Sequence, residues 1–136
     1  MFNLFSHSIP NKDICESIVS RFKLKELKKG DYLLKEGQIS NEYILLENGF
    51  IRSFSINLSG DEISTGFFSS QSPVFEPASF FLRQPSKEYF QALTDSLCWF
   101  ISFEELNKLF HEIPIFREYG RQILVKTLAQ SKMKYL

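Results

Sequence analysis

Histidine, cysteine and tryptophan are scarce in this sequence of 136 residues, which has two His, two Cys and one Trp. Cys15 and Cys98 lie far apart and in no spacing that a metal site uses, so a reduced, cytoplasmic setting is expected rather than a disulfide scaffold. His7 and His111 are too few for metal-dependent enzymes built on small β-folds, which need several inward-facing His. No metal site and no catalytic residue are therefore predicted.

The sequence also lacks an excess of charge, because 16 Lys and Arg balance 16 Asp and Glu. A protein that grips a nucleic-acid backbone presents a basic face, so this segment alone is not expected to bind DNA. No apolar run reaches the ~18 residues of a membrane span, and the N-terminus lacks the pattern of a secretion signal, so no membrane association is expected. The motifs of serine hydrolases, phosphate-binding loops and zinc proteases are missing as well, and we predict that the chain is not an enzyme.

Aromatic residues are abundant by contrast, at 15% of the sequence with 15 Phe, which predicts one well-packed domain. Residues 1–21 contain a short amphipathic helix, and residues 102–136 return to helical spacing, with Pro114 suited to the first turn of a long last helix. Over residues 22–101, segments rich in β-formers alternate with turn clusters at 28–31, 36–41, 47–49, 58–61 and 69–73. This order predicts a mainly β domain, a sandwich or small barrel, with flanking helices.

The first turns of the β region carry a more specific pattern. Gly30, Asp31, Glu36, Gly37 and Gly49 stand in the order and at the spacing of the corner residues of cyclic-nucleotide-binding domains. A second matching segment lies at residues 75–92. Together the two stretches extend the resemblance to that family over about residues 22 to 110. The resemblance implies a jelly-roll-like β-barrel of the cyclic-nucleotide-binding type with a long C-terminal helix.

Residues 75–92 resemble the phosphate-binding cassette of this family, with several of its chemical parts replaced. In the family a Phe-Gly-Glu turn precedes a short helix, the Glu accepts a hydrogen bond from the ribose 2′-hydroxyl, and a later Arg pairs with the cyclic phosphate. The Glu is Glu76 here, but Phe75 replaces the Gly and Ser86 replaces the Arg. A serine offers one neutral hydroxyl where a guanidinium offers a charged fork, so cyclic AMP is not expected to be the effector.

The candidate ligand site consists of cassette residues that the resemblance places around an effector. They are Phe75, Glu76, Ala78, Ser79, Arg83, Ser86, Lys87 and Tyr89. Glu76 has two interpretations, a ligand hydroxyl acceptor or the N-cap of the short helix. Arg83 and Lys87 are either solvated loop charges or the cations of an anion site, and either Tyr89 or Phe90 should face the pocket because strand neighbours point to opposite faces. The resemblance implies a small anionic or nucleotide-like effector and identifies no resident cofactor.

The C-terminal helix extends the resemblance to the Crp/Fnr family of bacterial transcription regulators, in which it pairs with the same helix of a second subunit. Here that helix is predicted over about 114–136, with Phe116, Tyr119, Ile123 and Thr127 on its inner face, and a helix wrapped by its own barrel is the alternative. Those regulators bind DNA through a helix-turn-helix that follows, and this sequence contains none. A homodimeric sensor half of a longer regulator is predicted, with a stand-alone, ligand-free protein-interaction domain as the alternative.

Overall fold

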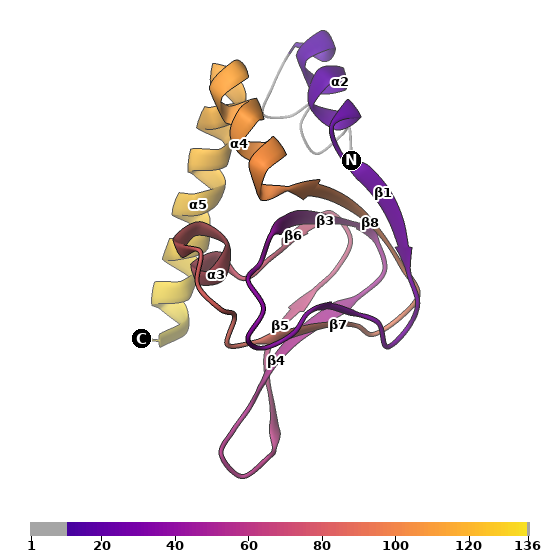
Figure 1. Ribbon diagram of the computed structural model, residues 1–136, viewed down its shortest axis with the longest axis vertical. Helices are drawn as coiled ribbons and strands as arrows, with labels where there is room; N and C mark the ends of the chain where they lie inside the picture. Colours follow the sequence, from indigo (N-terminus) through magenta and orange to yellow (C-terminus); the bar gives the residue numbers. More distant parts are fainter. Residues whose placement is uncertain (1–10, 136) are drawn as a thin grey trace. The chain divides into compact units, whose positions relative to one another are not determined.

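The computed structural model describes the backbone of residues 11–135 and the side chains of residues 11–122 and 124–126 (Figure 1). The chain divides into two compact units. One unit covers residues 22–103, and the other joins residues 11–21 to residues 104–135. The helices are α2 (Lys12–Ser20), α3 (Pro77–Leu82), α4 (Phe103–Glu112) and α5 (Pro114–Tyr135).

The strands of the first unit form two antiparallel four-stranded sheets. Sheet A has the order β1 (Lys23–Leu27), β8 (Ser96–Ser102), β3 (Glu42–Asn48) and β6 (Ser72–Val74). Sheet B has the order β2 (Tyr32–Leu34), β7 (Tyr89–Ala92), β4 (Ile51–Ile56) and β5 (Glu62–Phe68). The hairpin of β4 and β5 projects beyond the other strands of its sheet (Figure 1). This two-sheet arrangement confirms the mainly β, jelly-roll-like fold class predicted from the sequence.

The core of this unit contains apolar side chains from both sheets, because alternate residues of each strand point to the same face. Its buried members are Leu34, Ile44, Leu46, Ile51, Val74, Phe90, Cys98 and Phe100. The predicted barrel is not closed, however. Among the described residues, the edge strands β2 and β6 each pair with one neighbour in their own sheet and are only three residues long. Such short edges end a sheet rather than carry its hydrogen bonds into the next one.

Glycines stand at the corners between strands, as the turn clusters indicate. Gly30, Gly37, Gly49 and Gly60 have φ angles of 94°, 92°, 121° and 85°. Glycine adopts this left-handed region without a steric penalty. A second constraint acts at Gly49, where an added Cβ would lie 2.1 Å from the Oγ atom of Ser96. The corner between β3 and β4 therefore has no room for a side chain.

The second unit consists of helices α2, α4 and α5. Asn11 caps α2 by accepting a hydrogen bond from the amide of Ile14 at 3.1 Å. Arg21 follows α2 and forms ion pairs with Glu105 at 3.4 Å and Glu112 at 2.9 Å, both on α4. Within the described part of the chain, no helix is long and apolar enough to cross a membrane.

Two residues predicted at a subunit interface are buried inside the chain itself. Phe116 and Tyr119 are 1% and 7% exposed. Phe116 stacks on Phe110 of α4 at 5.2 Å and on Tyr119 at 5.7 Å between ring centroids. Within the single chain these two side chains pack against their own helical unit. The dimer interface predicted for this helix stays a prediction. Ile123 and Thr127, the other predicted interface residues, lie outside the described side chains.

Candidate effector-binding site

Glu76 is the N-cap of the cassette helix α3. Its carboxylate accepts a hydrogen bond from the amide of Ser79 at 2.5 Å, and its carbonyl oxygen accepts one from the amide of Phe80 at 2.9 Å. Pro77, at the start of the helix, has no amide to donate. Of the two interpretations of Glu76, the geometry matches the N-cap. The acid that contacts ribose in the family is here directed at the helix that it caps.

Ser79 connects α3 to the loop between β2 and β3. Its side chain is fully buried, and its Oγ atom accepts a hydrogen bond from the amide of Ser40 at 2.8 Å. Ala78, its neighbour, is exposed. The buried Ser79 hydroxyl therefore connects α3 to the β2–β3 loop, and Ser79 does not line the pocket described below.

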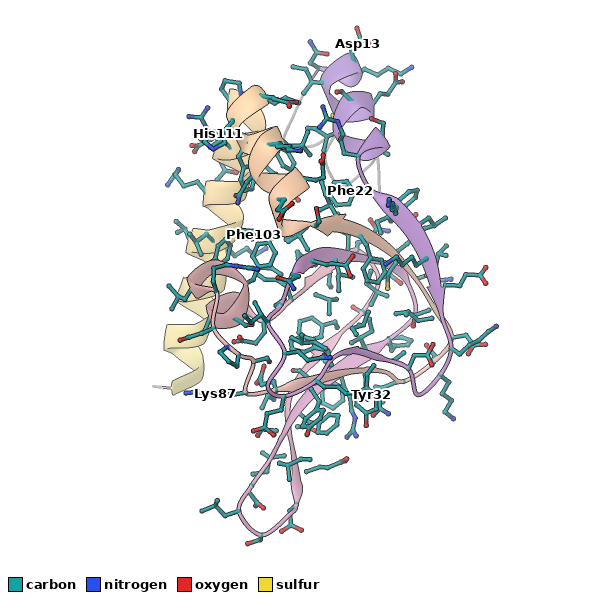
Figure 2. The ribbon with its side chains drawn as sticks, viewed as in Figure 1. Asp13, Phe22, Tyr32, Lys87, Phe103 and His111 are labelled. Atoms are coloured by element: carbon teal, nitrogen blue, oxygen red, sulfur yellow. The ribbon has the colours of Figure 1, made fainter. Side chains whose placement is uncertain are left out.

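Arg83 lies just beyond α3 and has a left-handed backbone with a φ of 57°. Its guanidinium donates to the carbonyl oxygens of Ser40 at 3.1 Å and Phe80 at 3.2 Å, and to the side-chain oxygen of Asn41. The same group stacks over the ring of Phe103, 3.9 Å from its centroid. Figure 2 labels Phe103, the first residue of α4. We call these contacts the Arg83 latch. They join the cassette, the β2–β3 loop and the first residue of α4, which is a structural use of the cation.

Ser86, which stands at the position of the phosphate-binding Arg, is 2% exposed. Its hydroxyl donates to the carbonyl oxygen of Glu88 at 2.9 Å and accepts from the amide of Glu88 at 3.0 Å. Its backbone pairs with the β2–β3 loop, through Gly37 at 2.8 Å and Gln38 at 2.7 Å. Both of these hydrogen bonds of the Ser86 hydroxyl are thus made to the backbone two residues along the chain. Lys87, the neighbouring cation, is exposed.

Phe75 fills the turn at which the family has glycine. Its ring lies 5.2 Å from Tyr43, 5.4 Å from Phe80 and 5.8 Å from Phe81, measured between centroids. Edge-to-face and tilted pairs at these distances are favourable. The strand end that approaches a ligand closely in the family is therefore packed with aromatic side chains here.

Tyr89 and Phe90 point to opposite faces of sheet B, and Phe90 is the one that faces the core. Phe90 is 2% exposed and stacks with Phe68 at 5.8 Å. Tyr89 stacks instead on Phe54 at 5.1 Å and meets the edge of Tyr32 at 6.0 Å. Of the two predicted alternatives, Phe90 is therefore the pocket residue, and Tyr89 belongs to an aromatic cluster on the other face.

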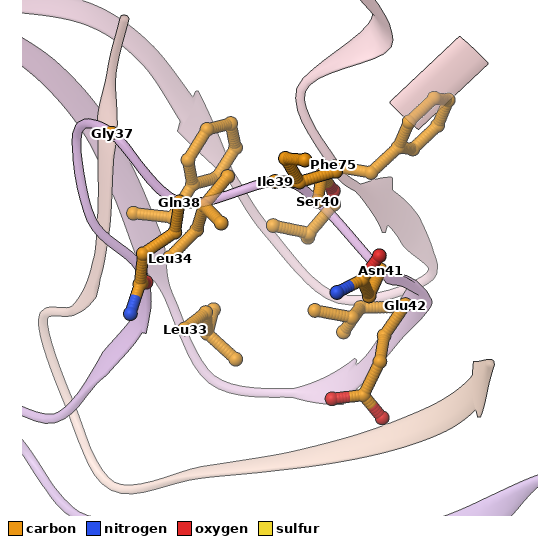
Figure 3. A pocket seen from close by; sticks show the side chains of 12 residues that line it. Leu33, Leu34, Gly37, Gln38, Ile39, Ser40, Asn41, Glu42 and Phe75 are labelled. Atoms are coloured by element: carbon orange, nitrogen blue, oxygen red, sulfur yellow. The ribbon is translucent and has the colours of Figure 1, made fainter. Parts of the chain in front are cut away.

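A pocket of about 580 Å³ lies beside the cassette (Figure 3). Only Phe75 of the predicted site residues lines it, and Glu76 and Ser86 do not. The β2–β3 loop, which sequence reasoning read only as a turn, supplies the largest part of the wall. The lining residues are Leu33, Leu34, Gly37, Gln38, Ile39, Ser40, Asn41, Glu42, Ile44, Val74, Phe75 and Phe90.

The two thiols lie buried among apolar groups. Burial raises the pKa of Cys98 to about 11 and also raises the pKa of Cys15. Both are therefore inert thiols at neutral pH rather than nucleophiles. The described residues contain no group of three or more His, Cys, Asp or Glu that could hold a metal ion.

The model of the cyclic nucleotide-binding domain family matches residues 24–113. The chain belongs to this family. Among curated relatives, the fumarate and nitrate reduction regulatory protein of Yersinia pestis is 32% identical over 117 residues, which are 86% of this chain and 44% of that protein. The chain thus spans less than half the length of this relative. The similarity to Crp/Fnr regulators predicted from the sequence is confirmed.

Solved structures show the same fold of the cyclic nucleotide-binding domain family. The Thermus thermophilus catabolite activator protein superposes with a TM-score of 0.83 at 15% identity, over 97% of this chain and 61% of that chain. The sensor domain of the transcriptional regulator DNR from Pseudomonas aeruginosa superposes with a TM-score of 0.72 at 13% identity, over 98% of this chain and 87% of that chain. At such low identity these likenesses establish the fold alone.

Proposed function

We propose that this chain is the cytoplasmic, effector-sensing domain of a homodimeric transcription regulator, that it has no enzymatic activity, and that it does not respond to cyclic AMP or cyclic GMP. Its family, its similarity to a bacterial regulatory protein and its fold support the sensor role. Binding to DNA would then belong to a helix-turn-helix elsewhere in the regulator.

The state of the cassette is the observation that carries the proposal. The Glu76 carboxylate is bonded to the first turn of α3, and the Ser86 hydroxyl is bonded to the backbone of Glu88. A cyclic phosphate would meet no guanidinium there. Losing a charge-assisted, bidentate contact costs on the order of 2 to 5 kcal/mol, which turns micromolar affinity into millimolar.

Another effector could act through the Arg83 latch. Arg83 stacks on Phe103, and the amide of Phe103 donates to the carbonyl oxygen of Asn41 at 2.7 Å. Phe103 is also the first residue of α4, so the chain continues from these contacts into the helices. A ligand that binds one conformation of the β2–β3 loop more tightly would raise the population of that conformation. It would also raise the population of the helix conformation that is coupled to it.

The alternative of a ligand-free interaction domain, its interior filled by its own Phe side chains, is less well supported. Phe75 and Phe90 do reach the pocket, yet about 580 Å³ stays open beside them. That volume lies within the range of about 300–1,000 Å³ typical of small-molecule sites. An effector is therefore the better explanation of this cavity.

A chimera tests the sensor role. Residues 1–136 would replace the segment that they match in the Yersinia pestis regulatory protein, and transcription would be read from a reporter that this regulator controls. We expect a folded, dimeric chimera whose reporter output differs from that of the remainder without any sensor. Light scattering and circular dichroism check assembly and folding. A chimera that folds and dimerises but leaves the reporter at the level of the remainder would contradict the proposal.

A further inference from the structure

We propose that the pocket lined by residues 37–42 binds a small, uncharged and mainly apolar molecule, at a site that adjoins the cassette and does not include Glu76 or Ser86. This departs from the small anionic or nucleotide-like effector implied by the family resemblance. That the molecule acts as the effector rests on the proposed sensor function, whereas its binding can be measured without that assumption.

The deep wall of the pocket is built from the core of the β unit. Leu34 and Phe90 come from sheet B, and Ile44 and Val74 come from sheet A. All four are core residues that are at most 8% exposed. Core side chains from both sheets therefore form part of the pocket wall, beside the polar groups of residues 38–42. Walls of this kind favour apolar ligands, with a few polar groups to orient them.

No Lys or Arg is among the residues that line the pocket. Glu42 is the one charged side chain among the lining residues (Figure 3). Its carboxylate lies 3.6 Å from the Nζ atom of Lys25. An anionic ligand would lose its hydration at this wall, and the neighbouring cations Lys25 and Arg83 are already paired with Glu42 and with oxygen atoms of Ser40 and Asn41. A phosphate or a carboxylic acid is therefore disfavoured.

Neutral polar groups on the rim can still orient a ligand. The side-chain oxygen of Gln38 accepts from the Lys35 amide at 2.9 Å, and that of Asn41 accepts from Arg83. These bonds leave the amide NH₂ groups of Gln38 and Asn41 as neutral donors. A ligand with one or two hydrogen-bond acceptors on an apolar body suits this arrangement.

The loop that covers the pocket is also the loop that the cassette holds. The amide of Gly37 donates to the carbonyl oxygen of Ser86 at 2.8 Å. The amide of Ser86 donates to the carbonyl oxygen of Gln38 at 2.7 Å. Farther along the loop, Ser40 is bonded to Ser79. A molecule that packs against residues 37–42 would therefore act on Ser79 and Ser86 through the loop, although neither residue lines the pocket.

Two fluorescent probes with the same ring skeleton test the ligand class on purified residues 1–136. N-phenyl-1-naphthylamine is neutral, and 8-anilinonaphthalene-1-sulfonate carries one sulfonate. We expect one molecule of the neutral probe to bind per chain, with a dissociation constant on the order of 10 to 100 µM. The sulfonate should bind at least about tenfold more weakly, because the pocket gives it no counter-charge.

Two matched substitutions place the binding in this pocket. Ile39→Trp fills the pocket from a residue that is 39% exposed, and Ile63→Trp makes the same change on β5, outside the pocket, at a residue that is 48% exposed. Ile39→Trp should weaken the neutral probe at least about tenfold, and Ile63→Trp should leave it unchanged. Circular dichroism melts of both variants would check that they fold.

A third variant tests the charge argument. Glu42→Gln removes the rim carboxylate and should tighten the sulfonate roughly two- to fivefold, with little effect on the neutral probe. No saturable binding of the neutral probe, equal affinity for both probes, or an unchanged affinity in Ile39→Trp would overturn the proposal. If the folded chimera leaves the reporter at the level of the remainder while the neutral probe binds clearly, the sensor function is refuted and the ligand class proposed for the pocket stands.

Discussion

Removing the Arg83 side chain should destabilise the β unit, because the latch is made of several contacts. The guanidinium forms hydrogen bonds with two carbonyl oxygens and with Asn41, and it stacks on Phe103. A typical hydrogen bond contributes about 0.5–1.5 kcal/mol and an exposed cation–π contact about 0.5–1 kcal/mol. Since the contacts are partly exposed and not additive, we expect Arg83→Ala to lower the free energy of unfolding by about 2 to 3 kcal/mol.

Two other substitutions at this position separate the side chain from the backbone. Arg83→Gly loses the same contacts but relieves the left-handed conformation, so its loss should be about 1 kcal/mol smaller than that of Arg83→Ala. Arg83→Lys keeps the charge without the planar fork and should lose roughly 1 to 2 kcal/mol. In a double-mutant cycle, Arg83→Ala and Asn41→Ala should show a coupling of about 1 kcal/mol.

Urea unfolding followed by tryptophan fluorescence measures these changes. Trp99, the one tryptophan of the chain, lies in β8 of the same unit as the latch, and its indole N–H donates to Glu47 at 3.2 Å. The change should lie in the midpoint, with the slope unaltered. An Arg83→Ala variant within about 0.5 kcal/mol of the original protein would refute the latch, because it would mean that the contacts make no net contribution to stability.

Three further outcomes follow from the same geometry. Glu76→Ala should lower the free energy of unfolding by about 1 kcal/mol, because the N-cap is lost, and Glu76→Asp should lower it much less. Urea midpoints measure both changes, and equal losses would contradict the capping role. Burial raises the pKa of Cys98 to about 11 from an ordinary 9.0, so its contribution to stability is present below pH 9 and lost between pH 9 and about 11. That alkaline loss should shrink in Cys98→Val, and an identical pH profile of the two proteins would count against it. Residues 1–136 alone should bind duplex DNA no more tightly than millimolar at about 0.15 M salt, and sub-micromolar binding in an anisotropy titration would overturn this expectation.

Local chemistry made the fold predictable from the sequence. Gly30, Gly37 and Gly49 do adopt positive φ, and the segments between the turns are strands. The unclosed barrel was not predicted, because turn spacing reveals where strands end and not which edges meet. The helix stripe of Phe116 and Tyr119 is assigned to a second subunit from amphipathic spacing, which shows that a face is apolar and not what covers it. In the described part of the chain, Phe116 of that stripe stacks on Phe110 of α4.

The candidate site was less predictable, because the same residue pattern fits both a ligand-binding role and a structural role. An acid before a short helix suits a ligand hydroxyl and an N-cap equally well, so the sequence could not decide for Glu76. From the sequence, Arg83 is simply a charged loop residue. Its partners Asn41 and Phe103 are far away in the sequence, and only the fold brings them into contact with it. The loop at residues 37–42 carries ordinary turn chemistry, and only the tertiary structure makes it the wall of a pocket.

The central claim is that the cassette no longer binds a cyclic phosphate, and calorimetry tests it most directly. Cyclic AMP and cyclic GMP would each be titrated into folded residues 1–136, whose integrity a circular dichroism melt confirms beforehand. With Ser86 at the Arg position and Glu76 bonded to its own helix, we expect no saturable heat up to about 1 mM of either nucleotide. Micromolar binding of either one, at one molecule per chain, would contradict the account.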